Sequence, residues 1–305
     1  MAYTSGEAST LYDVFEALDT LLLSIGWVQH DTKYTTGSTP RLCQCIWEGK
    51  GDGSDRIYVQ GRMDDTTFKR IAFDGCAGYD EHLEFWEQPG SIQQWLKVEE
   101  DITNPKQPVL TTTYNEKFYY WIFADTYRFV IVCRMSIVYE SCYVGFINPI
   151  ASERQYPYPM YVAGNGTMDG GTWPDNKQGS FVFAKDGSGY LRRADGTWRE
   201  FLASFPNPDA DSQGTLFPYN AHNTQLIPNY KEQDAINQDN FLLIPIMLHT
   251  SNPTDVNGVL RGCYWVSGTR DIDAERVFTF NGVSYIAFDT KQARGSNTYF
   301  CVKME

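Results

Sequence analysis

Apolar residues recur at helical spacing over one segment near the start of the chain, between residues 11 and 25. Thr10 followed by Asp13 is typical of a capping box, and Gly26 provides a stop signal. The polar positions between them are acidic, which indicates an outer face that is solvated or meets a basic partner. We therefore predict one amphipathic helix packed on a sheet. Its apolar stripe consists of Leu11, Val14, Phe15, Leu18, Leu21, Leu22 and Ile25.

The remainder of the chain carries short strand-like segments that are separated by turn residues. Three apolar runs at 118–123, 129–135 and 137–147 predict a meander, with a tight turn at 124–126. Asn281-Gly282 predicts a hairpin, because it supplies the two positive φ angles of a type I′ turn. The expected fold class is mainly β (α+β), with antiparallel β-sandwich or meander sheets and one N-terminal helix. Further strands are expected at residues 42–47, 56–61, 68–73, 190–193, 197–201, 241–248, 259–266 and 298–304.

Residues 164–179 are rich in Gly, Asn and Asp and predict a long loop. This loop suggests a boundary between residues 1–163, a helix plus antiparallel β region, and residues 164–305, a β-rich C-terminal region. One single domain with an insertion is the alternative.

The segment from 204 to 240 is polar and interrupted by prolines, so it can bury little apolar surface by itself. We expect an arm or long loop that becomes ordered only against a neighbouring subunit. The alternative is a loop packed back on its own domain.

The formal net charge of −13, with 25 basic against 38 acidic residues, argues against binding to nucleic acid or to an anionic membrane. The start of the chain has neither the basic nor the apolar region of a signal peptide. The longest apolar run, at 241–248, is too short to span a bilayer. These features predict a protein made in the cytoplasm without an export signal.

Cysteine and histidine give no pattern of a metal or catalytic site. We expect the cysteines to be buried free thiols, with Cys43 and Cys45 on one face of a strand. No nucleophile-elbow or phosphate-loop motif is present. The prediction is therefore a protein without catalytic residues, cofactor or metal. The residues concerned are Cys43, Cys45, Cys76, Cys133, Cys142, Cys263 and Cys301, with His30, His82, His222 and His249.

Two weaker signals concern acidic loops. Residues 209–214 match the opening of a calcium loop, but Asn220 stands where a bidentate Glu is usual, so a plain polar loop is favoured. Asp80, Glu81 and Glu84 precede Phe85-Trp86, and acids beside aromatic residues are typical of sugar-cleaving clefts. A solvated loop face is the favoured interpretation here as well.

Several segments together resemble a family of virion structural proteins of tailed bacteriophages, described as tail, neck or baseplate components. The central block, at 120–132 and 136–146, is the most specific part of the resemblance. The resemblance implies a virion component that forms a symmetric ring or sleeve and binds neighbouring tail, neck or baseplate proteins. It implies no catalytic residues. The other matching segments are 1–6, the helix ending in Gly26-Trp27, 149–159, 262–268 and 281–285.

Aromatic residues make up 15% of the chain, including 20 Tyr, and this composition suits protein interfaces or sugar binding. The alternative function is therefore a carbohydrate-binding or carbohydrate-cleaving module that recognises a host receptor. It depends on the loop acids and on Trp86, Trp95, Trp173 and Trp198.

Overall fold

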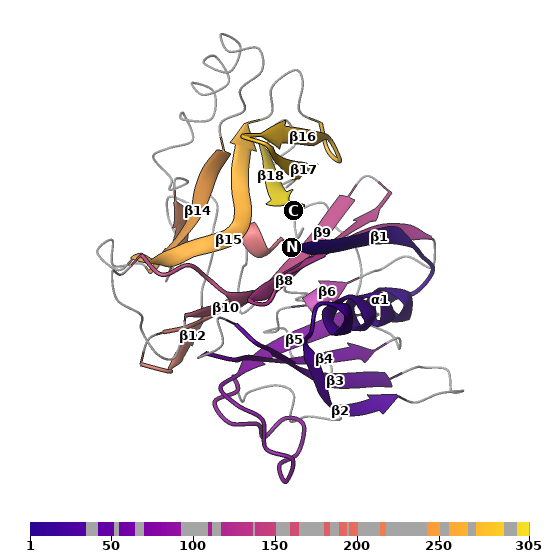
Figure 1. Ribbon diagram of the computed structural model, residues 1–305, viewed down its shortest axis with the longest axis vertical. Coiled ribbons are helices and arrows are strands. Elements are labelled where there is room, and N and C mark those ends of the chain that lie inside the picture. Colours follow the sequence, from indigo (N-terminus) through magenta and orange to yellow (C-terminus); the bar gives the residue numbers. More distant parts are fainter. Residues whose placement is uncertain are drawn as a thin grey trace.

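The fold consists of three antiparallel sheets and one α-helix among the described residues of this computed structural model (Figure 1). The mainly β, antiparallel fold class predicted from the sequence is confirmed. The structure describes residues 1–34, 42–51, 55–64, 70–92, 109–111, 117–136, 138–150, 159–164, 180–183, 189–193, 195–200, 214–217, 243–250, 256–267, 273–289 and 298–304.

Each sheet has its own strand order. Sheet A contains, in order, β1 (Ala2–Ala8), β7 (Phe118–Ala124), β8 (Arg128–Met135), β9 (Val138–Phe146), β10 (Met160–Ala163), β11 (Gly189–Arg192) and β12 (Trp198–Glu200). Sheet B contains β2 (Val28–Tyr34), β3 (Leu42–Gly49), β4 (Ile57–Asp64), β5 (Arg70–Cys76) and β6 (Val109–Thr111). Sheet C contains β13 (Gly214–Phe217), β14 (Leu243–Thr250), β15 (Val256–Ser267), β18 (Thr298–Lys303), β17 (Val283–Asp289) and β16 (Val277–Phe280). A short 3-10 helix, η1, spans Phe181–Phe183.

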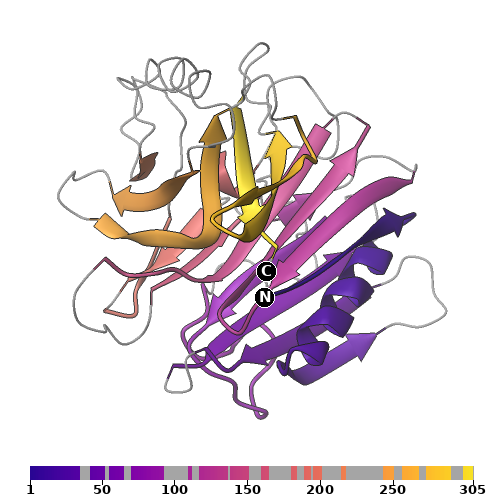
Figure 2. The same ribbon diagram turned by 45° about the horizontal axis from the view of Figure 1, so that its top comes forward.

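Sheet A is the middle layer, with sheet B on one face and sheet C on the other (Figures 1 and 2). Strand β8 illustrates why the central strands of sheet A are apolar. Phe129 and Ile131 belong to the core shared with sheet B, whereas Val130 and Val132 belong to the core shared with sheet C. Since successive side chains of a strand point to opposite faces, a strand covered on both sides must be apolar at nearly every position.

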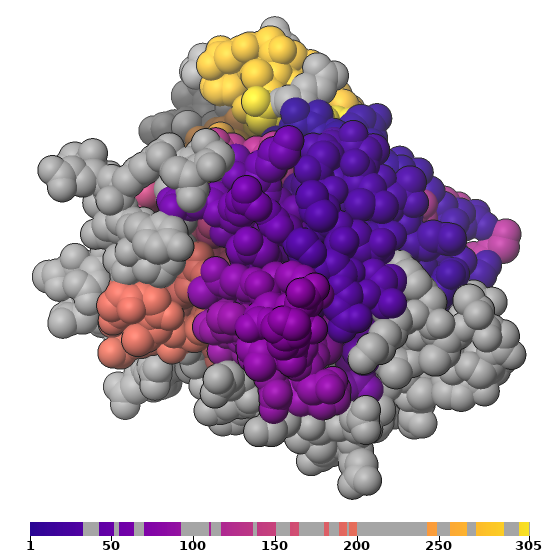
Figure 3. Space-filling view, turned by 60° about the horizontal axis from the view of Figure 1, so that its bottom comes forward, coloured from indigo at the N-terminus to yellow at the C-terminus, as the bar shows by residue number. Residues whose placement is uncertain are grey.

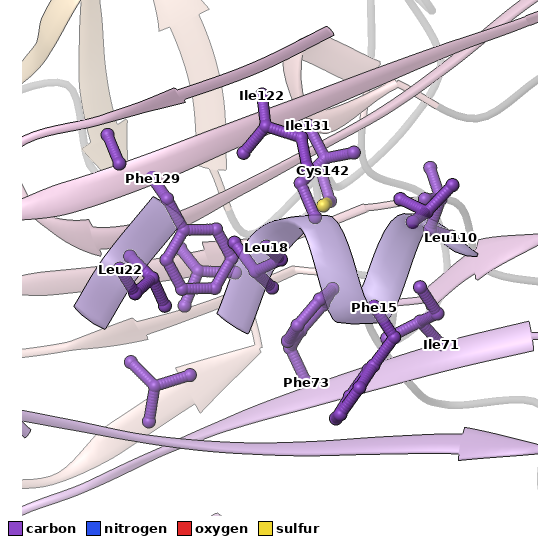
Figure 4. Close-up of a cluster of buried hydrophobic side chains, with 14 of the residues drawn as sticks. Phe15, Leu18, Leu22, Ile71, Phe73, Leu110, Ile122, Phe129, Ile131 and Cys142 are labelled. Atoms are coloured by element: carbon purple, nitrogen blue, oxygen red, sulfur yellow. The ribbon is translucent and has the colours of Figure 1, made fainter. Parts of the chain in front are cut away.

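Helix α1 (Leu11–Ser24) closes the core between sheets A and B. Figure 4 shows Phe15, Leu18 and Leu22 pointing into this core, toward Phe73 and Phe129. The capping box is confirmed, because the Asp13 amide donates to the Thr10 hydroxyl and the Asp13 carboxylate accepts from the Thr10 amide.

The end of α1 also follows the sequence signal. Ile25 is the C-cap residue, and Gly26 follows with a φ of +87°, a conformation that glycine adopts at little cost. One acidic residue of the outer face has an intramolecular role. The Asp19 carboxylate accepts from Trp47 Nε1 at 2.7 Å and from Gln29 Nε2 at 2.9 Å, so it ties the helix to sheet B.

The predicted hairpins are confirmed. Strands β7, β8 and β9 form the expected meander, and β11 pairs with β12. In the turn between β16 and β17, Asn281 has a φ of +49° and Gly282 a φ of +78°, as a type I′ turn requires.

The expected domain boundary between residues 163 and 164 lies between two paired strands, since β10 pairs with β11. Sheet A therefore continues across this position. The loop at 164–179 lies almost wholly outside the described residues.

The expected arm at 204–240 lies outside the described residues except for β13. This short strand pairs with β14 at the edge of sheet C. Part of the segment is thus a strand of the chain's own sheet, which the sequence did not predict.

All seven cysteines are free and buried, as predicted. Cys43 and Cys45 share a face of β3 and belong to the core between sheets A and B. Burial raises the pKa of the Cys45 thiol to about 12, so the thiol is a poor nucleophile at neutral pH. In the described part of the chain, no helix is long and apolar enough to cross a membrane.

Candidate interaction surfaces

Strand β1 forms one edge of sheet A, a role that the sequence did not predict. It pairs with β7 in an unbroken register from Ala2 opposite Ala124 to Ala8 opposite Phe118. Among the described strands, none pairs with its other side. The side chains of Tyr3, Ser5 and Glu7 are exposed. In the described part of the chain, a row of backbone amide and carbonyl groups along this side of β1 is therefore left without a partner strand.

An aromatic strip lies beside this edge, on the face of sheet A that is turned toward sheet C. We define the strip as Tyr3, Tyr119 and Trp121. Tyr3 is 46% exposed and Tyr119 is 44% exposed, while Trp121 is half-buried. The three side chains share one face because Tyr3 is paired with Phe123, and Tyr119 and Trp121 lie four and two residues before Phe123 on β7.

Neighbouring groups hold the strip in place. Tyr3 stacks on Phe123 with ring centroids 6.1 Å apart, and Trp121 packs edge-on against Phe288 at 5.3 Å. The Arg134 guanidinium lies 4.5 Å from the centroid of the Tyr119 ring, a cation–π distance.

Glu275, which lies just before strand β16 of sheet C, holds the Arg134 side chain in place. Its carboxylate accepts from the Arg134 guanidinium and, at 2.7 Å, from the Tyr139 hydroxyl. Burial, together with the hydrogen bond to Glu275, raises the pKa of Tyr139, so the phenol stays protonated and keeps donating. The aromatic strip is thus preorganised, which lowers the entropy cost of binding.

The loop 77–92 is a second surface, located on the outer face of sheet B (Figure 3, purple). Gln88 is buried at its centre. The Gln88 amide group donates to the carbonyl oxygens of Asp80, Leu83 and Glu84, and its oxygen accepts from the Asp80 amide at 2.8 Å. One side chain therefore holds the loop in its conformation.

The aromatic residues of this loop anchor it to the sheet. Phe85 is buried against Ile46 and Ala72 of sheet B, and Trp86 packs beside them. The Gln60 side chain donates to the Phe85 carbonyl oxygen. The loop's own rings thus face the protein, and this arrangement gives less support to a sugar cleft lined by them.

The acidic residues of the loop have different surroundings. Glu81 and Glu84 are exposed, whereas Asp80 is half-buried and accepts from the His82 amide at 2.9 Å. Of the other tryptophans proposed for sugar binding, Trp198 donates to the Gly90 carbonyl oxygen at 2.7 Å. Trp95 and Trp173 lie outside the described residues.

A buried carboxyl group lies below the end of this loop. Asp74 of β5 accepts from the Ile92 amide and is the cross-strand partner of Gln60. Burial raises its pKa to about 7, although hydrogen bonds from the Ile92 and Gly75 amides oppose the shift. No sequence signal distinguished this aspartate from the surface acids.

Sequence reasoning also missed a polar cluster on sheet B. His30 Nε2 lies 2.7 Å from a Glu48 carboxylate oxygen, and Arg56 pairs with the other oxygen. The His30 ring stacks on Tyr79 at 4.3 Å, which ties β2 to the loop 77–92. The cluster joins segments that are separate in the sequence, so no local motif could have predicted it.

The remaining candidate residues named from the sequence are His82, His222, His249 and the calcium-like segment. His82 is exposed beside Glu81. His222 and the calcium-like segment 209–213 lie outside the described residues, as does the His249 side chain. Within the described ranges, no group of three or more His, Cys, Asp or Glu side chains could hold a metal ion.

Comparison of the chain with protein-family models and with curated proteins finds no match.

Proposed function

We propose that this chain is a structural component of a tailed-phage virion, in the tail, neck or baseplate, which self-associates and binds neighbouring virion proteins. The observation that carries the proposal is the aromatic strip beside the open edge of β1. Tyrosine, tryptophan and arginine are enriched at the centres of protein interfaces, and here they lie on a rigid sheet.

The resemblance supports the same proposal. Its most specific part, residues 120–132 and 136–146, falls on strands β7, β8 and β9 and includes Trp121 of the aromatic strip. A net charge of −13 keeps such a chain soluble before assembly and away from the packaged genome.

Quantitative mass spectrometry of virions purified from the encoding phage tests this function. We expect the chain at a fixed copy number per particle, comparable with that of tail or neck proteins. Virions that lack the chain would refute the proposal, and a mock purification from uninfected host cells is the control.

A carbohydrate-binding host-receptor module is the second candidate, because half-exposed aromatic rings can also stack on sugars. Glycan-array binding that Tyr119→Ala abolishes would favour it. For the cleaving version, release of reducing ends from host polysaccharide should depend on Asp80, Glu81 or Glu84. If alanine at all three positions changes nothing, that version fails.

A further inference from the structure

Open sheet edges are normally protected, and the described edges of this protein differ in that respect. Proteins block edge strands by making them short, by bulges, or by placing lysine or proline on them. Strands β6 and β12 have three residues each, and β13 and β16 have four each. Strand β2 has seven residues, but its register is broken between Gln29 and Thr32 and it carries Asp31 and Lys33.

Strand β1 has none of these protections. Its seven residues contain no proline, lysine or arginine, and its register with β7 is continuous. Its one charge, Glu7, is paired with Lys117 of the same chain. A regular, nearly uncharged edge of this length is suited to the addition of another strand.

We propose that β1 pairs antiparallel with β1 of a second copy of this chain, across a twofold axis at Ser5. The two copies of sheet A then form one continuous sheet. This inference rests on the proposed self-association and names the surface through which it occurs.

The sequence of β1 is complementary to itself in this register. Tyr3 lies opposite Glu7 of the second copy, and Thr4 lies opposite Gly6. Because the single acid is displaced from the axis, no like charges meet, and a phenol hydroxyl faces each carboxylate. The side chains of Ala2, Thr4, Ser5 and Gly6 are small, so few bulky groups meet above and below the joined sheet.

A second copy fits better than an unrelated strand because a twofold contact closes on itself. Pairing β1 with β1 uses the open edge of both copies and leaves only the short β12 edge at each end of the joined sheet. The aromatic strips of the two copies then lie on the same face, on either side of the axis, and form one larger surface.

Cysteine cross-linking tests the register directly. In the proposed dimer the two Ser5 residues are direct partners, within the Cα distance of about 4.4–6.8 Å that a disulfide spans. Ser5→Cys should therefore give a disulfide-linked dimer on a non-reducing gel. The seven native cysteines are buried, so they should contribute little background.

Thr4→Cys is the matched control. Thr4 lies opposite Gly6 of the second copy, so two introduced thiols are offset by two residues and about 8 Å apart, beyond the reach of a disulfide. We expect at least about tenfold more dimer from Ser5→Cys than from Thr4→Cys. Equal cross-linking of both variants would contradict the register.

Charge placed on the axis provides an independent test. Ser5→Lys puts two ammonium groups directly opposite each other and should raise the dimer dissociation constant roughly tenfold or more, whereas Ser5→Thr should not. Sedimentation equilibrium measures both constants, and circular dichroism checks that each variant is folded. If Ser5→Lys does not fold, the comparison of Ser5→Cys with Thr4→Cys decides whether β1 pairs in this register.

The outcomes separate this inference from the proposed function. If the wild type self-associates while Ser5→Cys does not cross-link and Ser5→Lys still associates, β1 pairing is wrong and another surface is used. A wild type that stays monomeric, with no Ser5→Cys dimer, also overturns the inference. In both cases the proposed virion function is judged separately, by the composition of purified virions.

Discussion

Replacing Asp74 by asparagine is expected to flatten the pH dependence of the protein's stability. Asp74 is 2% exposed, and burial raises its pKa from an ordinary value of 3.8 to about 7. The folded protein therefore retains a proton that the unfolded chain releases. The contribution of Asp74 to the unfolding free energy is greatest below the pKa that this group has in the unfolded chain. It falls as the pH rises through the window from about 4 to about 7.

The magnitude follows from the size of the shift. Each pKa unit corresponds to about 1.4 kcal/mol, so a shift of about three units corresponds to about 4 kcal/mol in total. Of this, about 2.5 kcal/mol of unfolding free energy should be lost between about pH 5 and about pH 8. The carboxamide of the Asp74→Asn variant cannot ionise, yet its oxygen can still accept from the Ile92 amide. The unfolding free energy of this variant should therefore not fall through ionisation at position 74.

Urea unfolding at several pH values measures this difference. The control is Glu84→Gln, which removes an exposed carboxylate from the neighbouring loop and should leave the wild-type profile unchanged. The wild-type profile minus the Asp74→Asn profile isolates the contribution of Asp74. Parallel wild-type and Asp74→Asn profiles would refute the reasoning, because the carboxyl group would then titrate alike in both states.

Three further predictions concern the core, the loop and assembly. Phe15→Ala should lower the unfolding free energy by about 3–5 kcal/mol in urea titrations, since Phe15 is fully buried against Trp47; Glu16→Ala on the same helix should change it little. Gln88→Ala should speed hydrogen exchange and proteolysis within residues 77–92, while the amides of sheet A stay protected. An equal loss of protection in the loop and in sheet A would show that Gln88 supports the whole fold. Self-association should strengthen as the ionic strength rises from about 0.01 M to about 0.15 M, because salt shortens the Debye length from about 30 Å to about 8 Å and so screens the repulsion between copies of charge −13. Weaker association in salt would point instead to attractive ion pairs at the interface.

The sequence by itself determined the elements whose signals are local. The Thr10–Asp13 capping box and the apolar stripe define helix α1, and Asn281-Gly282 defines the turn between β16 and β17. In the capping box and in the turn, the residues that carry the signal also form the local structure, within a few positions along the chain. The apolar stripe is likewise recognised from local spacing, although its contacts in the core lie on distant segments. Such interactions are encoded before any tertiary structure exists.

Only the tertiary structure decided the role of β1. Residues 2–8 are small and polar for a strand, and they form one because β7, more than a hundred residues later, provides the paired edge. Likewise, Asp74 resembles any other acid in the sequence, and its raised pKa results from burial beneath the loop end at Ile92. Edge position and burial depend on which distant segments meet, and for that reason no local pattern could reveal either the open edge or the buried carboxyl group.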